Sequence, residues 1–275
     1  MQVAKEVMST DYVKVDVNDP ISKLIGKLME THERGAVVFD GKKYKGVLWK
    51  KWLLKSKVHP ASMRVSEVTV SAPKLKGDES IEDVARLLLT ANAYLLPVFE
   101  DEKVIGVVKA INVVRVLKER PEGKKKVKEI ATEKPFVLHE RDRVGKAIEI
   151  YREEGISRLP LVDHEGKLVG IFNFTDLIEK YILKQAKSDY GSRSKHTETK
   201  SFDGNPPDLR ALEVIGFKAP ILVTAHPNTT ISEVIDDLVN YNINSVIVEK
   251  ELKPVGIVTI TDLLKLFLPP ERLTY

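Results

Sequence analysis

One pair of polar residues has a spacing that could hold a sugar. Thr259 and Asp262 stand three and six residues after Gly256. If a helix begins after this glycine, the two side chains lie three residues apart on one face and can reach the hydroxyls of one sugar. The same residues have a simpler use, because Thr259 or Thr261 can cap the helix and Asp262 is favourable in its first turn. The residues alone leave the two interpretations open.

The same spacing recurs once in the chain. Asn173 and Asp176 stand three and six residues after Gly170. An amide here replaces the hydroxyl, while the carboxylate is kept. This second pair is therefore a candidate for a second site of the same kind.

No constellation typical of catalysis accompanies these pairs. The chain has no cysteine, which excludes thiolate chemistry and disulfides. His139, His164, His196 and His226 lack the spacing of metal ligands,. Neither a nucleophile elbow, a GxGxxG run nor a Walker loop is present. We therefore expect a protein that is not an enzyme and that holds no metal or catalytic cofactor.

Composition favours a globular, cytoplasmic protein without a membrane span. Of the 275 residues, 43% are hydrophobic, but no apolar stretch reaches the roughly 18 residues of a spanning helix, and no secretory signal is visible. The net charge of +4 and the pI near 8.9 suit phosphate-bearing ligands, yet fall short of the basic stripe of a dedicated nucleic-acid-binding protein. The charged fraction of 31% is typical of proteins from hot environments,.

Four segments repeat one helical pattern. In each, apolar residues recur at i, i+3, i+4 and i+7, which places them on one helix face. The four sets are Ile21, Leu24, Ile25 and Leu28; Ile81, Val84, Ala85 and Leu88; Val144, Ala147, Ile148 and Tyr151; and Ile231, Val234, Ile235 and Leu238. Two residues before these sets stand Asp19, Glu79, Asp142 and Thr229. We expect the helix caps at these positions.

Each helix is followed by two short β-type runs and a glycine. Gly46, Gly106, Gly170 and Gly256 lie 25, 25, 26 and 25 residues after the first apolar helix position. The extra residue of the third copy falls in its polar turn at 163–166. A second helix, ending near Lys55, Lys118, Ile182 and Phe267, closes each βαββα copy,. The copies span residues 1–57, 64–120, 126–186 and 210–270.

These motifs resemble those of the cystathionine-β-synthase (CBS) domain family. The third copy reads Leu-Pro-Leu-Val-Asp at 159–163, then Gly170 and Asp176, and the fourth reads Gly-Ile-Val-Thr-Ile-Thr-Asp at 256–262. The resemblance covers nearly the whole chain. It implies an α+β fold whose repeats pair into two modules, 1–120 and 121–275, which commonly form a flat pseudo-symmetric disk within one chain or in a homodimer.

Two segments lie outside the repeat. Residues 118–128 contain Pro121, Gly123 and three consecutive lysines, and we interpret them as the linker between the modules. The polar insertion 187–208 has no apolar period. We expect it to be a mobile loop, with a lid over a ligand or partner as the alternative.

The resemblance also implies a function. CBS modules bind adenosine compounds, so AMP, ADP, ATP or S-adenosylmethionine is the expected ligand, and a partner protein is expected to respond to the resulting change in module geometry. Ribose would be held by Thr259, Asp262, Asn173 and Asp176, and phosphate by Ser157, Arg158 and Arg34. The base would be read by the backbone of two segments, Lys134, Pro135, Phe136 and Val137, and Ala219, Pro220, Ile221 and Leu222, with Ile156 and Ile243 as apolar walls.

The first two copies depart from this pattern. Trp49 and Trp52 in copy one, and Lys109 and Asn112 in copy two, stand where the ribose residues would lie. Neither pair offers a carboxylate. We therefore expect nucleotide in the second module, and we interpret the tryptophans as packing anchors rather than as surfaces for a stacked base.

Two other functions stay open. A scaffold or interaction subunit that has lost ligand binding would explain the degenerate first module. Nucleic-acid binding would use the basic run 124–128 together with Arg193 and Lys195, although a run of like charges is more often simply solvated.

Overall fold

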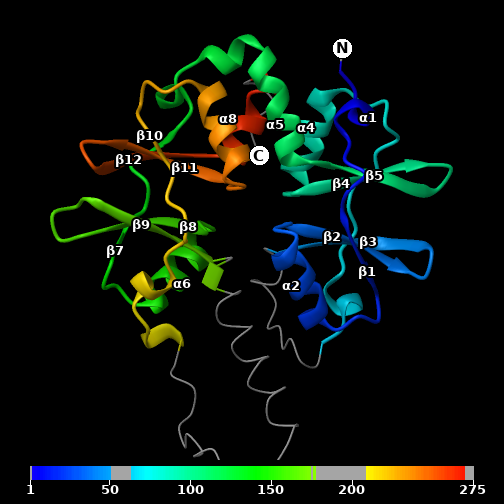
Figure 1. Cartoon of the computed structure of the whole chain (residues 1–275), viewed down its shortest axis with the longest axis horizontal. Coiled ribbons are helices and arrows are strands. Elements are labelled where there is room, and N and C mark those ends of the chain that lie inside the picture. Colours follow the sequence, from blue (N-terminus) through cyan, green and yellow to red (C-terminus); the bar gives the residue numbers. More distant parts are fainter. Residues whose placement is uncertain (1, 51–62, 175, 178–208, 270–275) are drawn as a thin grey trace, which may run out of the picture. The chain divides into compact units, whose positions relative to one another are not determined.

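The chain alternates helices and short strands (Figure 1), and the computed structural model describes residues 2–50, 63–174, 176–177 and 209–269. The α-helices are α1 (Ala4–Val7), α2 (Ile21–Glu30), α4 (Ile81–Thr90), α5 (Ala110–Arg115), α6 (Val144–Glu154), α8 (Ile231–Asn240) and α9 (Ile260–Lys265). The strands are β1 (Val13–Asp16), β2 (Gly35–Asp40), β3 (Lys43–Trp49), β4 (Leu95–Glu100), β5 (Lys103–Lys109), β6 (Thr132–Glu133), β7 (Leu138–His139), β8 (Arg158–Val162), β9 (Leu168–Asn173), β10 (Thr224–Ala225), β11 (Ser245–Lys250) and β12 (Lys253–Thr259).

Each copy contains a helix followed by a hairpin. β2 and β3, β4 and β5, and β8 and β9 pair antiparallel, and β11 and β12 are neighbours in the fourth sheet. A short strand before the helix adds in parallel to β2, β8 and β11, and Leu75 takes this place beside Val98 in copy two. The predicted repeat is confirmed, with the longer turn of copy three between Val162 and Leu168.

Each hairpin also receives a piece of the neighbouring copy. Ser9 pairs antiparallel with Val107, Val70 with Val47, β6 with β12, and Lys218 with Phe172. Copies one and two therefore exchange segments, and so do copies three and four. We use the name crossing segments for the residues that lead from each exchanged pair back to the copy's own sheet: 10–12, 71–74, 134–137 and 219–222.

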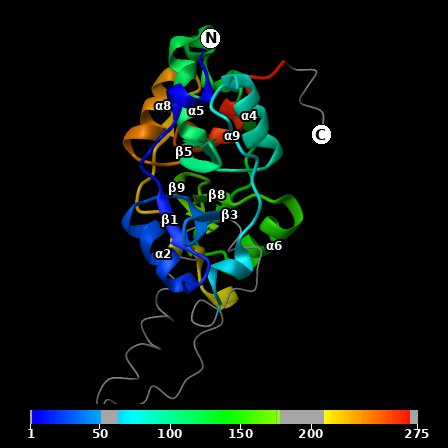
Figure 2. The same cartoon turned by 90° about the vertical axis from the view of Figure 1, so that its right-hand side faces the viewer.

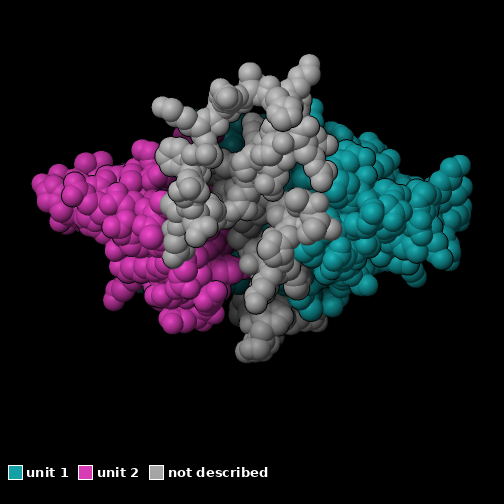
Figure 3. All heavy atoms as spheres, turned by 90° about the horizontal axis from the view of Figure 1, so that it is seen from below, with its two compact units in different colours: residues 1–133, 223–248, 256–275 teal, residues 134–222, 249–255 magenta. Residues whose placement is uncertain are grey.

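The chain forms two compact units (Figure 3). The first contains Met1–Glu133, Val223–Val248 and Gly256–Tyr275, and the second contains Lys134–Leu222 and Glu249–Val255. The first unit thus joins copies one and two with the helices of copy four. These units divide the chain differently from the modules 1–120 and 121–275. The strand exchange supports the pairing within those modules, which we keep as a proposal for the domain organisation.

The N-caps lie one residue later than we expected from the sequence. They are Pro20, Ser80, Arg143 and Thr230. In the first three copies the expected cap residue instead accepts a backbone N–H in the turn before the helix. The pairs are Asp19 with Asp16, Glu79 with Gly77, and Asp142 with His139. In copy four the cap is Thr230 rather than Thr229. A carboxylate near a helix start can serve either purpose, so the spacing alone does not separate the two.

The predicted apolar faces are buried in three helices. In α2, α4 and α8 all four predicted positions are buried. In α6, Val144 and Ala147 are buried, whereas Ile148 and Tyr151 are half-buried. The ring of Tyr151 packs against Phe174, with 4.8 Å between the ring centroids.

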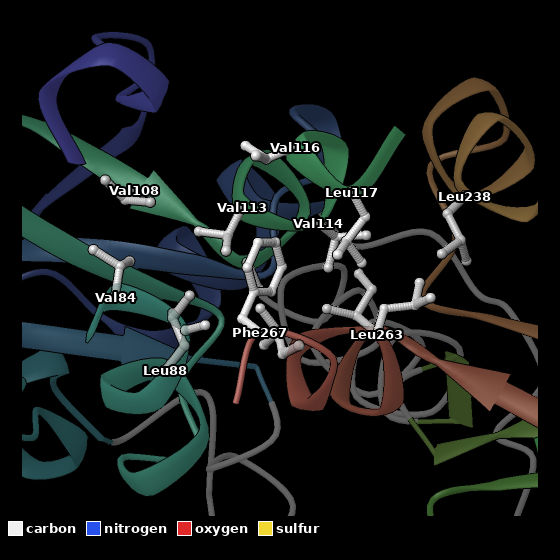
Figure 4. Packing of buried hydrophobic residues seen from close by; sticks show 14 of the residues in the cluster. Val84, Leu88, Val108, Val113, Val114, Val116, Leu117, Leu238, Leu263 and Phe267 are labelled. Atoms are coloured by element: carbon white, nitrogen blue, oxygen red, sulfur yellow. The ribbon is translucent and has the colours of Figure 1, made fainter. Parts of the chain in front are cut away.

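The core of the first unit is a cluster of helices from copies two and four. Figure 1 and Figure 2 both show α4, α5, α8 and α9 together. In Figure 4 the buried side chains Val113 and Val114 of copy two meet Leu263 and Phe267 of copy four. Trp49 is buried in the same cluster, as expected of a packing anchor.

An arginine ties the end of copy two to this cluster. The guanidinium of Arg120 lies 4.8 Å from the centroid of the Phe267 ring. The same group donates a hydrogen bond of 2.7 Å to the carboxylate of Glu82 on α4. A planar cation can stack on a ring and bind a carboxylate at once, so Arg120 connects α4 to the last turn of copy four.

Residues 118–128, which we expected to act as a linker, form ordered turns. The 3-10 helices Pro121–Lys124 and Val127–Glu129 bury Gly123 and Val127. The carbonyl of Lys125 accepts the N–H of Ile231 at 2.9 Å, and Lys118 forms an ion pair with Asp236 of α8. This segment therefore belongs to the fold of the first unit.

Some expectations lie outside the described residues. They concern Trp52, the helix ends at Lys55 and Ile182, the basic residues Arg193 and Lys195, and the insertion 187–208.

We expect Leu263→Ala to lower the free energy of unfolding by about 2 to 5 kcal/mol, because Leu263 is fully buried in the helix cluster and its truncation leaves a cavity,. Leu252→Ala is the matched control, since Leu252 is 57% exposed and should change stability by less than about 0.5 kcal/mol. Urea unfolding of both variants measures the difference. Equal effects would show that the cluster is not the core of this unit.

We expect Glu233 to contribute to the loss of stability in acid. The hydroxyl and the N–H of Thr230 donate to its carboxylate at 2.6 and 2.7 Å, which lowers the pKa of Glu233. A pKa that is lower in the folded chain stabilises the fold above the unfolded pKa, and this contribution is lost as the pH falls through the folded value. In urea unfolding below about pH 4, Glu233→Gln should therefore lose stability less steeply than the parent chain. An identical pH dependence would contradict this role.

Candidate ligand-binding site

One backbone hydrogen bond positions the candidate residues in every copy. The residue that follows each hairpin donates its N–H to the carbonyl of the residue just before that hairpin. The pairs are Lys50 to Arg34 at 2.8 Å, Ala110 to Tyr94 at 2.9 Å, Phe174 to Ser157 at 3.1 Å and Ile260 to Asn244 at 3.0 Å. This bond holds the two ends of each hairpin side by side, where the ribose and phosphate candidates of one copy were expected.

Thr259 and Asp262 hold each other at the start of α9. Oδ2 of Asp262 accepts from the hydroxyl of Thr259 at 2.7 Å and from its N–H at 3.0 Å, and the Thr259 hydroxyl accepts the N–H of Asp262 at 3.3 Å. Oδ1 lies 3.3 Å from Nζ of Lys265. The capping interpretation of this pair is therefore confirmed. Ribose binding would have to use Oδ1, and it stays a proposal.

A buried amide lies next to this pair in copy four. Oδ1 of Asn244 is buried and has no hydrogen-bond partner among the described residues. Buried polar atoms without a partner are uncommon in folded proteins and call for an explanation such as a bound ligand. Ile243, the predicted apolar wall for the base, is half-buried and directly precedes this amide.

The polar candidates of copy three gather at one end of its hairpin. Arg158 and Asn173 are opposite each other in the pairing of β8 with β9. Ser157 precedes this pair, and Asp176 lies in the helix that starts at Phe174. All four are half-buried. The structure thus brings the predicted ribose and phosphate residues of copy three to a single place in the second unit.

The predicted base-binding segments are crossing segments with exposed apolar side chains. Phe136 and Ile221 are 46% and 43% exposed. Val137 and Leu222, which complete the predicted segments 134–137 and 219–222, are exposed as well. Of the remaining predicted residues of these segments, Lys134 and Pro220 are exposed, and Pro135 and Ala219 are half-buried. Ile156, which follows α6, is half-buried.

The four crossing segments differ in sequence between the two pairs of copies. The segments 10–12 and 71–74 of the first two copies read Thr-Asp-Tyr and Ser-Ala-Pro-Lys, whereas those of copies three and four read Lys-Pro-Phe-Val and Ala-Pro-Ile-Leu. Only the segments of copies three and four therefore carry the apolar side chains that an apolar ligand would require. The signal was present in the sequence, but it depends on knowing where each segment crosses.

The corresponding positions of the first two copies have structural partners. Lys109 forms an ion pair with Glu33 of copy one. Nδ2 of Asn112 donates to the carbonyl of Val7 at 2.7 Å and so holds α1. Trp49 is buried. These side chains support the pairing of copies one and two.

Arg34, predicted to bind phosphate, contacts the chain itself. Its Nη1 and Nη2 donate to Oδ1 and to the carbonyl of Asn242 at 2.9 and 2.7 Å. Both residues belong to the first unit, whereas Ser157 and Arg158 belong to the second. Sequence reasoning did not identify Asn242, because it is 208 residues away from Arg34.

Two of the histidines have local partners. Nδ1 of His139 accepts the N–H of Arg141, and Nδ1 of His226 accepts the N–H of Asn228, both at 3.2 Å. Within the part of the chain that the structure describes, no group of three or more histidine and carboxylate side chains could hold a metal ion. In the same part, no helix is long and apolar enough to cross a membrane.

The chain belongs to the CBS domain family. The family model matches four segments, residues 4–48, 65–119, 127–182 and 218–269, which together are more than half of the chain. Each match corresponds to one of the four copies. CBS-domain proteins are typically regulatory and bind adenosine ligands.

Relatives from Methanocaldococcus jannaschii align with most of the chain. The uncharacterized protein MJ1404 is 25% identical over 95% of this chain, and MJ1225 is 26% identical over 70% of it. The chain spans 61% of the length of MJ1404 and 65% of that of MJ1225. The crystal structure of MJ1225 superimposes with a TM-score of 0.77 at 20% identity, covering 96% of this chain and 99% of that one. The fold is therefore that of a protein with four CBS repeats.

We expect Thr259→Ala to lower the free energy of unfolding by about 1 kcal/mol in the absence of ligand, because the hydroxyl caps α9,. Thr261→Ala is the control, since Thr261 is exposed and should change stability by less than about 0.5 kcal/mol. Chemical denaturation measures both. A larger effect of the control would contradict the observed cap.

Proposed function

We propose that the chain is a regulatory module that binds an adenosine nucleotide through copies three and four and signals to a partner protein by a change of geometry. The candidate ligands are AMP, ADP, ATP and S-adenosylmethionine. The signalling step and the partner are part of the same proposal, as is assembly into a homodimer.

The exposed apolar crossing segments support this proposal most strongly. Among the described residues, seven large hydrophobic side chains are exposed, and four of them are Phe136, Val137, Ile221 and Leu222. A soluble chain gains stability by burying such groups. Their concentration in two equivalent segments fits an apolar slot that is filled by a flat base when ligand binds.

Polar groups suited to the rest of a nucleotide are present in both copies. In copy three, the guanidinium of Arg158 and the hydroxyl of Ser157 can bind phosphate, and Asp176 can accept from ribose hydroxyls. In copy four, Oδ1 of Asp262 and the amide of Asn244 could serve the sugar. Each copy therefore carries its own set of groups for one ligand.

A scaffold role is favoured for the first two copies. The ion pair of Lys109 with Glu33 and the bond from Asn112 to Val7 use the positions that would otherwise face a ligand. These copies keep the repeat, but the side chains at its ligand-facing positions contact other residues of copies one and two. A chain in which all four copies are scaffolds is therefore the alternative function.

A thermal-shift screen of the full chain with the four ligands tests the proposal. Binding to the native state alone stabilises by RT ln(1 + [L]/Kd), about 2.7 kcal/mol at a hundredfold excess over Kd. At least one ligand should raise the melting temperature. If none of the four does so, the scaffold function is favoured.

We expect Asp262→Asn and Asp176→Asn each to weaken binding at one site by about ten- to a hundredfold, because a carboxylate accepts more strongly than an amide from two ribose hydroxyls. Asparagine keeps an acceptor for the cap, so the melting temperature without ligand should change little. Titration calorimetry on the full chain measures the loss.

Asn112→Ala is the control for these two variants. Asn112 stands at the equivalent position of copy two and bonds to Val7, so its loss should leave nucleotide affinity unchanged. If Asn112→Ala weakened binding while both aspartate variants did not, the site would have been assigned to the wrong copies.

A further inference from the structure

A residue of copy one holds a turn of copy four. The two nitrogens Nη1 and Nη2 of Arg34 donate to Oδ1 and to the carbonyl of Asn242 at 2.9 and 2.7 Å. Asn242 returns a bond of 3.2 Å from Nδ2 to the carbonyl of His32. Three hydrogen bonds thus join two loops that are about 200 residues apart in the sequence.

The two loops are equivalent in the repeat. His32 follows α2 and Asn242 follows α8, and both have a left-handed backbone, with φ of 54° and 49°. A guanidinium that binds the side chain and the carbonyl of one residue restrains the orientation of that residue as well as its distance. Arg34 therefore fixes the direction in which the chain leaves α8.

The turn leads directly to the candidate residues of copy four. Ile243 and Asn244 follow Asn242, and the carbonyl of Asn244 accepts the N–H of Ile260. Ile260 begins α9, which Thr259 and Asp262 cap. The contact of Arg34 with Asn242 is thereby connected, through two residues and one hydrogen bond, to the pair proposed to hold ribose.

We propose that Arg34 is a positioning residue for the ligand site of copy four and that it acts through Asn242. The inference rests on the proposed function. It gives copy one, which lacks a ribose carboxylate, a part in the binding of ligand by copy four. Because Arg34 orients the turn, its contribution is the same for ligands with and without phosphate, whereas a direct phosphate contact would favour only the phosphorylated ligands.

Titration calorimetry of the full chain with adenosine, AMP and ATP tests this inference. The Asp176→Asn background weakens the copy-three site, so that the site of copy four is measured. Arg34→Gln and Asn242→Ala should each reduce the affinity for all three ligands by about tenfold, and the double variant should lose no more than either single one. Arg86→Gln is the control, because Arg86 forms an ion pair with Asp83 of its own helix, and the substitution should leave affinity unchanged.

Three results would overturn the inference. A loss for AMP and ATP but not for adenosine in Arg34→Gln would make Arg34 a phosphate ligand. Additive losses in the double variant would show that Arg34 does not act through Asn242. Lower melting temperatures without ligand, at unchanged affinity, would make the contact purely structural. If the parent chain binds none of the three ligands, the proposed function fails first, and the inference fails with it.

Discussion

The pairing between copies in this fold depends on the open edge of each hairpin. A two-stranded hairpin leaves backbone N–H and C=O groups unpaired on its last strand, and here every copy covers that edge with residues of its neighbour. The arrangement also explains the glycines of copies one and two. A Cβ at Gly46 would lie 2.5 Å from the carbonyl oxygen of Val70, and one at Gly106 would lie 2.8 Å from that of Ser9. Only glycine lets the neighbouring backbone approach this closely.

This exchange sets the character of the crossing segments. A segment that leaves one sheet and enters the next must stay extended, and few of its side chains can be buried by its own copy. In copies one and two the segments contain mostly polar residues, whereas in copies three and four they carry the exposed side chains of Phe136 and Ile221. The same backbone path therefore offers a solvated surface in one pair of copies and an apolar surface in the other.

Periodic features could be predicted from the sequence, and contacts between distant copies could not. The apolar faces of α2, α4 and α8 follow from spacing alone, because burial of one helix face imposes a period of 3.6 residues,. The caps were placed one residue early, since Asp19 and Asp142 close the preceding turn with the same chemistry that a cap would use. The contact of Arg34 with Asn242 has no local signature at all. It depends on how copies one and four pack.

The strand exchange between copies also bears on the proposed regulatory function. A ligand shifts a conformational equilibrium only through contacts that differ between the two states. A ligand that touched a single copy would stabilise that copy and change little else. In copy four, Lys218 pairs with Phe172 of β9, and the crossing segment 219–222 then leads the chain to β10. The proposed base-binding residue Ile221 thus lies, along the chain, between a residue that pairs with the neighbouring copy and the first strand of its own copy.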